Sequence, residues 1–136
     1  MLFTKASEYA LLSLILIAKS DQSKDVDTIS TKLGISKSFL AKILQKLAKD
    51  GILKSFKGAN GGFSLALKPS EISVMDIIKS AEKKEISVFE CSVDQDKCPI
   101  SQMRDCQIWP MFNAVQNKID DFLSSISLAD IIKKKI

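Results

Sequence analysis

Three cysteines lie within one polar segment of the sequence, "CSVDQDKCPISQMRDC" at residues 91–106. Cys91, Cys98 and Cys106 have the spacing C-x6-C-x7-C, and the sequence contains no other cysteine and no histidine. Thiols of this kind can bind an iron–sulfur cluster, bind zinc, form a redox disulfide, or remain unreactive. Structural zinc sites usually contain a C-x2–4-C pair, which is absent here. Iron–sulfur clusters are held by thiolates, usually with four protein ligands, of which this segment supplies three.

A thiol switch remains an alternative to the cluster. It needs an exposed cysteine whose thiolate is favoured by positive charge. Lys97 and Arg104 would favour a thiolate, and the acidic residues that oppose them are Glu90, Asp94, Asp96 and Asp105. Structural disulfides are disfavoured because we expect a cytoplasmic protein. The apolar run from Tyr9 to Ala18 ends at Lys19 without a small-x-small cleavage site, and it is too short to span a membrane.

Length and composition predict one small globular domain, with or without an appended arm. The 136 residues are 46% hydrophobic and 26% charged, which suits a folded rather than a disordered chain. We find no histidine, no glycine-rich phosphate loop and no nucleophile motif. The sequence therefore does not predict an enzyme.

Positive charge is concentrated in the N-terminal half. Residues 1–68 carry eleven Lys against five acidic residues, whereas residues 69–136 carry nine basic residues against eleven acidic ones. The stretch from Lys32 to Lys57 holds seven Lys and only one acid, Asp50. On charge alone this is either a solvated face or a surface for a polyanion such as DNA.

The stretch "DVDTISTKLGISKSFLAKILQKLAKDGIL" predicts two helices joined by a short turn. Asp25 and Ser36 are placed to cap them, and Gly34 interrupts the pattern between them. One side of the second helix is an apolar stripe that we expect to face the core: Phe39, Leu40, Ile43, Leu44 and Leu47. The other side is polar and basic, with Lys37 near its start: Ser38, Lys42, Gln45 and Lys49. This pattern is typical of a helix-turn-helix that contacts the major groove; a protein-binding face would be more aromatic and apolar.

A β-hairpin is predicted directly after these helices. The runs "ILKSFK" and "GFSLAL" are joined by "GANG", which contains an Asn60-Gly61 pair. Helix, turn, helix and hairpin together form a winged helix. Lys57, Gly58 and Asn60 at the tip are small or basic enough to approach DNA, whereas Gly61 is expected to serve the turn.

The C-terminal half predicts three further helices. In "ISVMDIIKSAEKK", Ser73 and Asp76 have capping-box spacing. A long helix is expected to start near Pro110, and "SLAD" caps a last short one. The long helix carries apolar residues three and four apart, which suits either pairing with another helix or packing on its own domain: Phe112, Val115, Ile119, Phe122 and Ile126. We interpret them as a homodimer interface.

The predicted fold is mainly α with a small β-hairpin wing. We expect a winged helix-turn-helix domain at 1–85, a cysteine loop at 86–107, and a dimerisation helix with a short C-terminal helix at 108–136.

The order of these parts resembles the Rrf2 family of bacterial winged-helix transcription regulators. The resemblance rests on "TKASEYALLSL", "LGISKSFLAKILQKLAKDGIL", "KGANGGFSL", "ISVMDII", the three-cysteine loop and "SISLADII", and it covers nearly the whole chain. It implies a homodimer that is paired through the long helix and binds a near-palindromic site on double-stranded DNA. It does not imply a membrane partner.

The resemblance also implies roles for individual residues at the DNA. It places Ser36, Lys37, Ser38 and Lys42 at the bases and the wing in the minor groove. Lys57 stands where the family has an arginine. It keeps the positive charge but lacks the planar guanidinium group, which can make two parallel hydrogen bonds. Ala41 replaces an acidic residue that contacts bases in iron–sulfur members, so we expect a different operator. The stretch "AEKKE" also departs from the family pattern.

For the cysteine loop, the resemblance implies a [2Fe–2S] or [4Fe–4S] cluster held by Cys91, Cys98 and Cys106. Where some members place a histidine ligand, this chain has Trp109. In nitric-oxide-sensing members an acidic residue on the partner's first helix completes the coordination, and Glu8 occupies that place here. Asp94, Asp105 and solvent are the other candidates for the fourth ligand. Glu8 can instead simply favour the start of a helix that begins near Thr4.

These observations predict a sequence-specific transcriptional regulator whose operator affinity is controlled by an iron–sulfur cluster. The signal would be redox state, nitric oxide or iron–sulfur status. The alternatives are a regulator switched by thiol oxidation without a cluster, and a winged-helix module that binds another protein.

Overall fold

The computed structural model describes residues 3–97 and 106–136. Predictions that concern Cys98, Arg104 and Asp105 therefore lie outside the described residues. The described chain is mainly helical with one two-stranded antiparallel sheet, which confirms the predicted fold class. Its elements in chain order are α1 Lys5–Ala18, α2 Val26–Leu33, α3 Lys37–Lys49, β1 Leu53–Phe56, β2 Gly62–Leu65, η1 Pro69–Glu71, α4 Val74–Glu82, η2 Gln95–Lys97, α5 Trp109–Ser125 and α6 Leu128–Ile132.

The predicted helix-turn-helix consists of α2 and α3. The Asp25 carboxylate accepts the Thr28 backbone N–H at 2.7 Å and so caps α2, and Gly34 ends that helix in the left-handed region with φ 66°. Ser36 occupies the N-cap position of α3 as expected, but its side chain makes no cap hydrogen bond. The Ser36 hydroxyl lies 3.1 Å from the Ser38 hydroxyl instead.

The apolar side of α3 faces the core, apart from one residue. Leu40, Ile43, Leu44 and Leu47 are buried with residues of α1 and α4. Phe39, which we expected in the same stripe, is 40% exposed and packs edge-on against Tyr9 with ring centroids 5.7 Å apart. It lies at the edge of the core because the stripe is wider than the surface that α1 covers.

The wing is a hairpin of β1 and β2, paired from Leu53–Leu65 to Phe56–Gly62. Residues 57–61 form its loop. A side chain at Gly61 would lie 2.7 Å from the Phe56 carbonyl oxygen, which supports the expected role of this glycine in the turn. The backbone of Lys24 exchanges two hydrogen bonds with Phe63, at 2.8 and 2.9 Å, and so ties the wing to the segment before α2.

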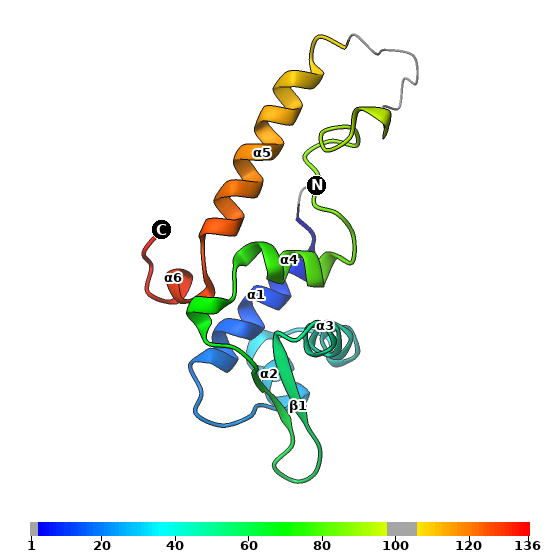
Figure 1. Cartoon of the computed structure of the whole chain (residues 1–136). Coiled ribbons are helices and arrows are strands. Elements are labelled where there is room, and N and C mark those ends of the chain that lie inside the picture. The colour runs from blue at the N-terminus through cyan, green and yellow to red at the C-terminus, as the bar shows by residue number, and fades with distance from the viewer. Residues whose placement is uncertain (1–2, 98–105) are drawn as a thin grey trace.

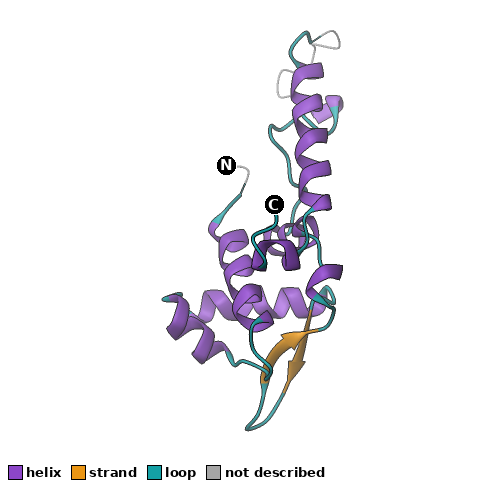
Figure 2. Cartoon of the chain, turned by 90° about the vertical axis from the view of Figure 1, so that its left-hand side faces the viewer, coloured by secondary structure: helices purple, strands orange, loops and turns teal. Residues whose placement is uncertain are grey.

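The C-terminal part of the chain leads from α5 back to the winged helix, where α6 packs. Helix α5 extends away from the body, and the wing lies at the opposite end of the molecule (Figures 1 and 2). Pro110 lies in the first turn of α5, as predicted. After α5, Ser127 and Asp130 form a complete capping box for α6, and Leu128 is buried in the core while its N–H donates to Ile72 O at 2.9 Å. Within the described ranges no helix is long and apolar enough to cross a membrane.

Candidate DNA-binding face and cysteine segment

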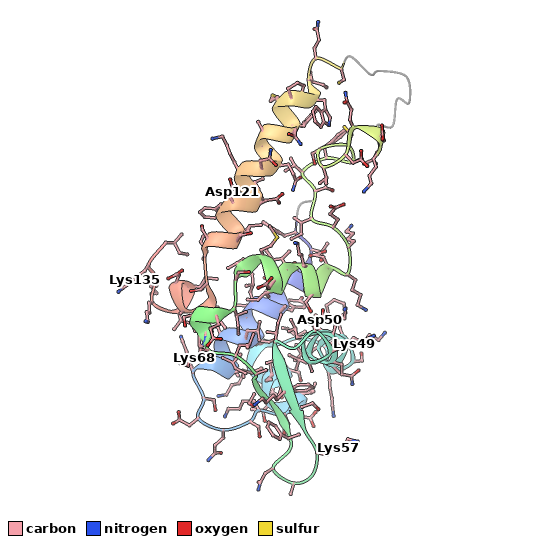
Figure 3. The ribbon with its side chains drawn as sticks, viewed as in Figure 1. Lys49, Asp50, Lys57, Lys68, Asp121 and Lys135 are labelled. Atoms are coloured by element: carbon pink, nitrogen blue, oxygen red, sulfur yellow. The ribbon has the colours of Figure 1, made fainter. Side chains whose placement is uncertain are left out.

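The outer side of α3 is polar and open to solvent. Ser38, Lys42, Gln45 and Lys49 are all exposed there. Figure 3 shows Lys49 on α3 and Lys57 on the wing, both on the part of the molecule that lies away from α5. Lys37 differs from them because its ammonium pairs with the Asp27 carboxylate of α2 at 2.8 Å, and this hydrogen bond raises the pKa of Lys37. A phosphate would have to compete with Asp27 for that lysine.

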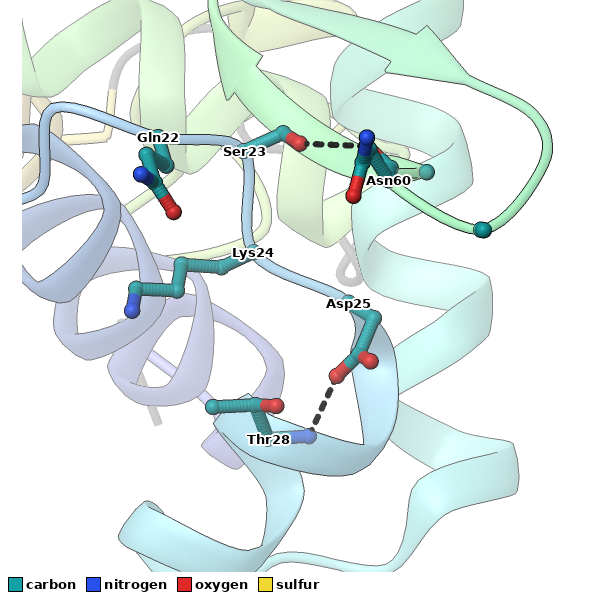
Figure 4. A pocket seen from close by; sticks show the side chains of 8 residues that line it. Gln22, Ser23, Lys24, Asp25, Thr28 and Asn60 are labelled. Atoms are coloured by element: carbon teal, nitrogen blue, oxygen red, sulfur yellow. Dashed lines mark hydrogen bonds between the residues drawn. The ribbon is translucent and has the colours of Figure 1, made fainter.

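The wing tip is fixed against the segment that precedes α2. Ser23 Oγ donates to the backbone carbonyl of Asn60 at 2.9 Å (Figure 4). Both residues line a polar hollow of about 520 Å³. Lys24 and Thr28 line it too, and we did not single out either of them from the sequence. The hydrogen bonds from Thr28 lower the pKa of Asp25, which therefore keeps a negative charge at the start of α2. Gly58, with φ 97°, and Lys57 are exposed beside this hollow.

The far end of α3 is anchored to α4. The Asp50 carboxylate accepts hydrogen bonds from Ser80 Oγ at 2.6 Å and from Lys46 Nζ at 2.9 Å. These two bonds lower the pKa of Asp50, with Ser80 contributing most. The orientation of α3 is thus tied to α4, the helix that leads into the cysteine loop.

Of the predicted cluster ligands, the structure places Cys91, Cys106 and Glu8. Cys91 is 5% exposed, and Cys106 is half-buried just before α5. The Cys91 backbone carbonyl accepts a hydrogen bond from Trp109 Nε1 at 2.7 Å. Trp109 occupies the position where some members of the family that the sequence resembles have a histidine ligand. Here its side chain holds the backbone of the cysteine loop instead.

Glu8 lies on α1, and its side chain is 50% exposed and pairs with Lys5 Nζ at 2.7 Å. Among the described residues, no three cysteine or acidic side chains come close enough together to bind one metal ion. Within a single chain, Glu8 therefore does not form a metal site with Cys91 and Cys106.

Glu8 borders an open hollow of about 500 Å³ between α1, α4 and α5. Its apolar lining is Phe3, Leu11, Val74, Ile78 and Leu123.

Some of the predicted dimer residues are exposed to solvent, and others pack against residues of the same chain. Phe122 is 54% and Val115 38% exposed, and Ile119 is half-buried. Phe112 stacks on Phe89 of the cysteine loop with ring centroids 5.1 Å apart. Ile126 lies beyond the end of α5 and is buried against α4, so within the chain it is a core residue, contrary to our expectation.

We name the outward side of α5 the α5 apolar face. It consists of Ile108, Met111, Val115, Ile119 and Phe122, of which Ile108 and Met111 were not predicted. The spacing of three and four residues could have identified both of them.

A protein-family comparison matches residues 3–134 to the Rrf2 model, which is described as an iron-dependent transcriptional regulator. The chain belongs to the Rrf2 family. A protein of Aquifex aeolicus, provisionally named an HTH-type transcriptional regulator, is 32% identical over 97% of this chain and 92% of its own length. The HTH-type transcriptional regulator IscR of Aliivibrio salmonicida is 30% identical over 97% of this chain and 77% of its own length.

Solved structures agree with this membership. IscR of T. potens superposes with a TM-score of 0.72 at 26% identity, over 98% of this chain and 87% of that one. CymR, named the global cysteine regulator of B. subtilis, superposes with a TM-score of 0.74 at 22% identity, over 98% of both chains, and shows the shared fold. This Rrf2-family chain is therefore a DNA-binding transcriptional regulator with a winged helix, and the relatives named here are regulators rather than enzymes.

Proposed function

We propose that this Rrf2-family regulator acts as a homodimer whose operator affinity is controlled by an iron–sulfur cluster. Ser36, Lys37, Ser38 and Lys42 would meet the bases from the start of α3. Gln45, Lys49, Lys57, Gly58 and Asn60 would line the adjoining DNA surface. The exposed, polar side of α3 supports DNA rather than a protein as the ligand of this face.

The α5 apolar face supports the homodimer. In the described chain α5 packs mainly on α4 and the cysteine loop, and Phe122 and Val115 remain exposed to solvent. A two-fold dimer that buries this face would place its two α3 helices about 34 Å apart, one turn of DNA, and would require a near-palindromic operator.

The residues that would hold the cluster are Cys91, Cys98 and Cys106, with Glu8 of the partner subunit as the fourth ligand. The Cys91 backbone is bonded to Trp109 and Cys106 directly precedes that residue's helix, so both cysteines lie near the start of α5. Thiolates are the ligands that such clusters prefer. Glu8 is exposed on α1, so a partner's loop can approach it. When bound, the cluster would supply an iron centre that responds to oxidants or nitric oxide.

The placement of Cys91 is the observation that carries this proposal. Its 5% exposure disfavours Cys91 as the reactive thiol of a switch, because such a thiol must be accessible. Its backbone is bonded to Trp109 at the start of α5, the helix that also carries the α5 apolar face. Cluster occupancy and dimer geometry would therefore be linked through one helix, which is what an allosteric regulator requires.

The test is anaerobic purification, followed by absorption spectroscopy and analysis of iron and sulfide per chain. The proposal predicts cluster absorption bands with stoichiometric iron and sulfide, and their loss in Cys91→Ala and Cys106→Ala. A protein without iron that forms a disulfide under mild oxidation would support the thiol-switched regulator instead.

A further inference from the structure

Residues 86–92, which we call the Cys91 segment, lie along α5 and are bonded to one buried side chain of that helix. Gln116 is only 2% exposed. Its Oε1 accepts the Val88 backbone N–H at 2.7 Å. It also lies 2.7 Å from Ser92 Oγ, whose one proton is shared between this oxygen and the Phe89 carbonyl at 2.8 Å. Its Nε2 donates to the Ile86 carbonyl at 2.9 Å. One amide thus holds the segment at three of its residues.

The fourth hydrogen bond of Gln116 is made within the helix. Nε2 also donates to Asp120 Oδ1 at 2.9 Å, one turn further along α5. Both amide hydrogens and two acceptor positions of the oxygen are therefore used. A buried amide is costly unless it is satisfied in this way, and an apolar residue of similar volume would fill the same space without that cost. We therefore attribute to this glutamine a positioning role that packing alone does not require.

Other side chains on the same face of α5 hold the rest of the Cys91 segment. Trp109 Nε1 donates to the carbonyl of Cys91 at 2.7 Å, and Asn113 Nδ2 donates to the carbonyl of Ser92 at 3.0 Å. Trp109, Asn113 and Gln116 are spaced by four and three residues, so they lie along one side of the helix. We call these three side chains the α5 anchor.

We propose that Gln116 is the positioning residue that keeps the Cys91 thiol buried and in register with α5. The α5 anchor and the α5 apolar face lie on adjacent sides of the same helix, as the succession of Val115 and Gln116 shows. A displacement of the Cys91 segment would therefore act on the helix that forms the proposed dimer contact. This regulatory consequence rests on the proposed function, whereas the positioning of Cys91 does not.

The positioning role can be tested in metal-free, reduced protein. Alkylation of each cysteine by a maleimide would be followed by mass spectrometry in wild type and in Gln116→Met, which keeps the volume but removes all four hydrogen bonds. Gln22→Met is the matched control, because it makes the same substitution at an exposed glutamine in the segment before α2, away from α5. Hydrogen exchange at the Val88 amide, whose N–H is bonded to Gln116, gives a second readout.

We expect Cys91 to be alkylated at least ten times faster in Gln116→Met. The rate at Cys106, and both rates in the Gln22→Met control, should be unchanged. A factor of ten corresponds to one net hydrogen bond of about 1.4 kcal/mol. The Val88 amide should lose protection to a similar extent. An unchanged Cys91 rate, or an equal rise at both cysteines, would overturn the positioning role, because the second result indicates general loosening.

A milder variant covers the case in which Gln116→Met does not fold. Trp109→Phe keeps an aromatic ring but removes the N–H that donates to Cys91. It should raise the Cys91 alkylation rate about threefold, the lower end of the range for one hydrogen bond. If this rate does not change either, the α5 anchor does not position Cys91.

The anaerobically reconstituted protein separates this inference from the proposed function. Gln116→Met should lose its cluster absorption in air severalfold faster than wild type and Gln22→Met. If wild type takes up no iron, the proposed function fails but the alkylation result still decides the role of Gln116. If wild type holds a cluster and the alkylation rates are equal, only the positioning role of Gln116 is refuted.

Discussion

Phe122 offers a quantitative test of the proposed dimer. It is 54% exposed on the α5 apolar face, and its neighbours there include Val115. A phenylalanine side chain presents about 200 Å², so roughly 100 Å² of Phe122 remains available for burial by a partner. At about 25 cal/mol per Å², this is worth about 2.5 kcal/mol per subunit. The two-fold axis doubles the contribution to about 5 kcal/mol per dimer.

Phe122→Ala should therefore weaken the dimer strongly without unfolding the chain. The alanine side chain still buries part of this area. We therefore expect the variant to lose at least half of the free energy of about 5 kcal/mol per dimer. The dissociation constant of the dimer should rise about a hundredfold or more. Sedimentation equilibrium over a range of protein concentrations measures this change directly.

Phe56→Ala is the matched control. Phe56 is a phenylalanine of similar exposure, 49%, but it lies on β1 of the wing at the opposite end of the molecule from α5. It should leave the dissociation constant of the dimer unchanged. The reasoning is refuted if both variants weaken the dimer equally, or if wild type is monomeric at micromolar concentration.

Three further predictions concern DNA, stability and the fourth ligand. Lys42→Ala and Lys57→Ala should each lower the salt slope of operator binding by about 0.9 for every phosphate that the lysine neutralises, whereas Lys118→Ala on α5 should not; binding isotherms across salt concentrations measure this. Glu82 accepts hydrogen bonds from the start of α1; burial raises its pKa, but these bonds lower it by more, so its net pKa lies below the ordinary value. Its contribution to stability is therefore present at neutral pH and declines as the pH falls below about 4. The difference in unfolding free energy between Glu82→Gln and wild type, measured with urea, should be largest near neutral pH and shrink as the pH falls below about 4. Glu8→Ala should keep a reconstituted cluster with an altered spectrum and faster loss in air, and an unchanged spectrum and lifetime would eliminate Glu8 as a ligand.

Features that depend on neighbouring residues could be predicted from the sequence. Asp25, Gly34 and Pro110 act within one turn of their helices, and the structure confirms each of them. The hairpin was likewise predicted, because its strands are separated by a loop of only residues 57–61. Local sequence therefore determines the winged helix to a large extent.

Features that depend on contacts between distant segments were missed or misplaced. The role of Gln116 depends on Val88, 28 residues away along the chain, and no local pattern indicates which segment packs on that side of α5. Ile126 fits the three-four spacing of α5, but the helix ends before it and its backbone pairs with Val74. Periodicity identifies an apolar side of a helix, but it does not identify what covers that side.

The central claim is that a cluster at the cysteine loop controls DNA affinity. The most direct measurement is the operator dissociation constant of one anaerobic preparation before and after removal of iron, at fixed salt, with Cys91→Ala measured in parallel. The account predicts a change of about tenfold in wild type, within the usual range of allosteric coupling, and no change in Cys91→Ala. Equal affinities of the cluster-bound and cluster-free wild-type protein would contradict it.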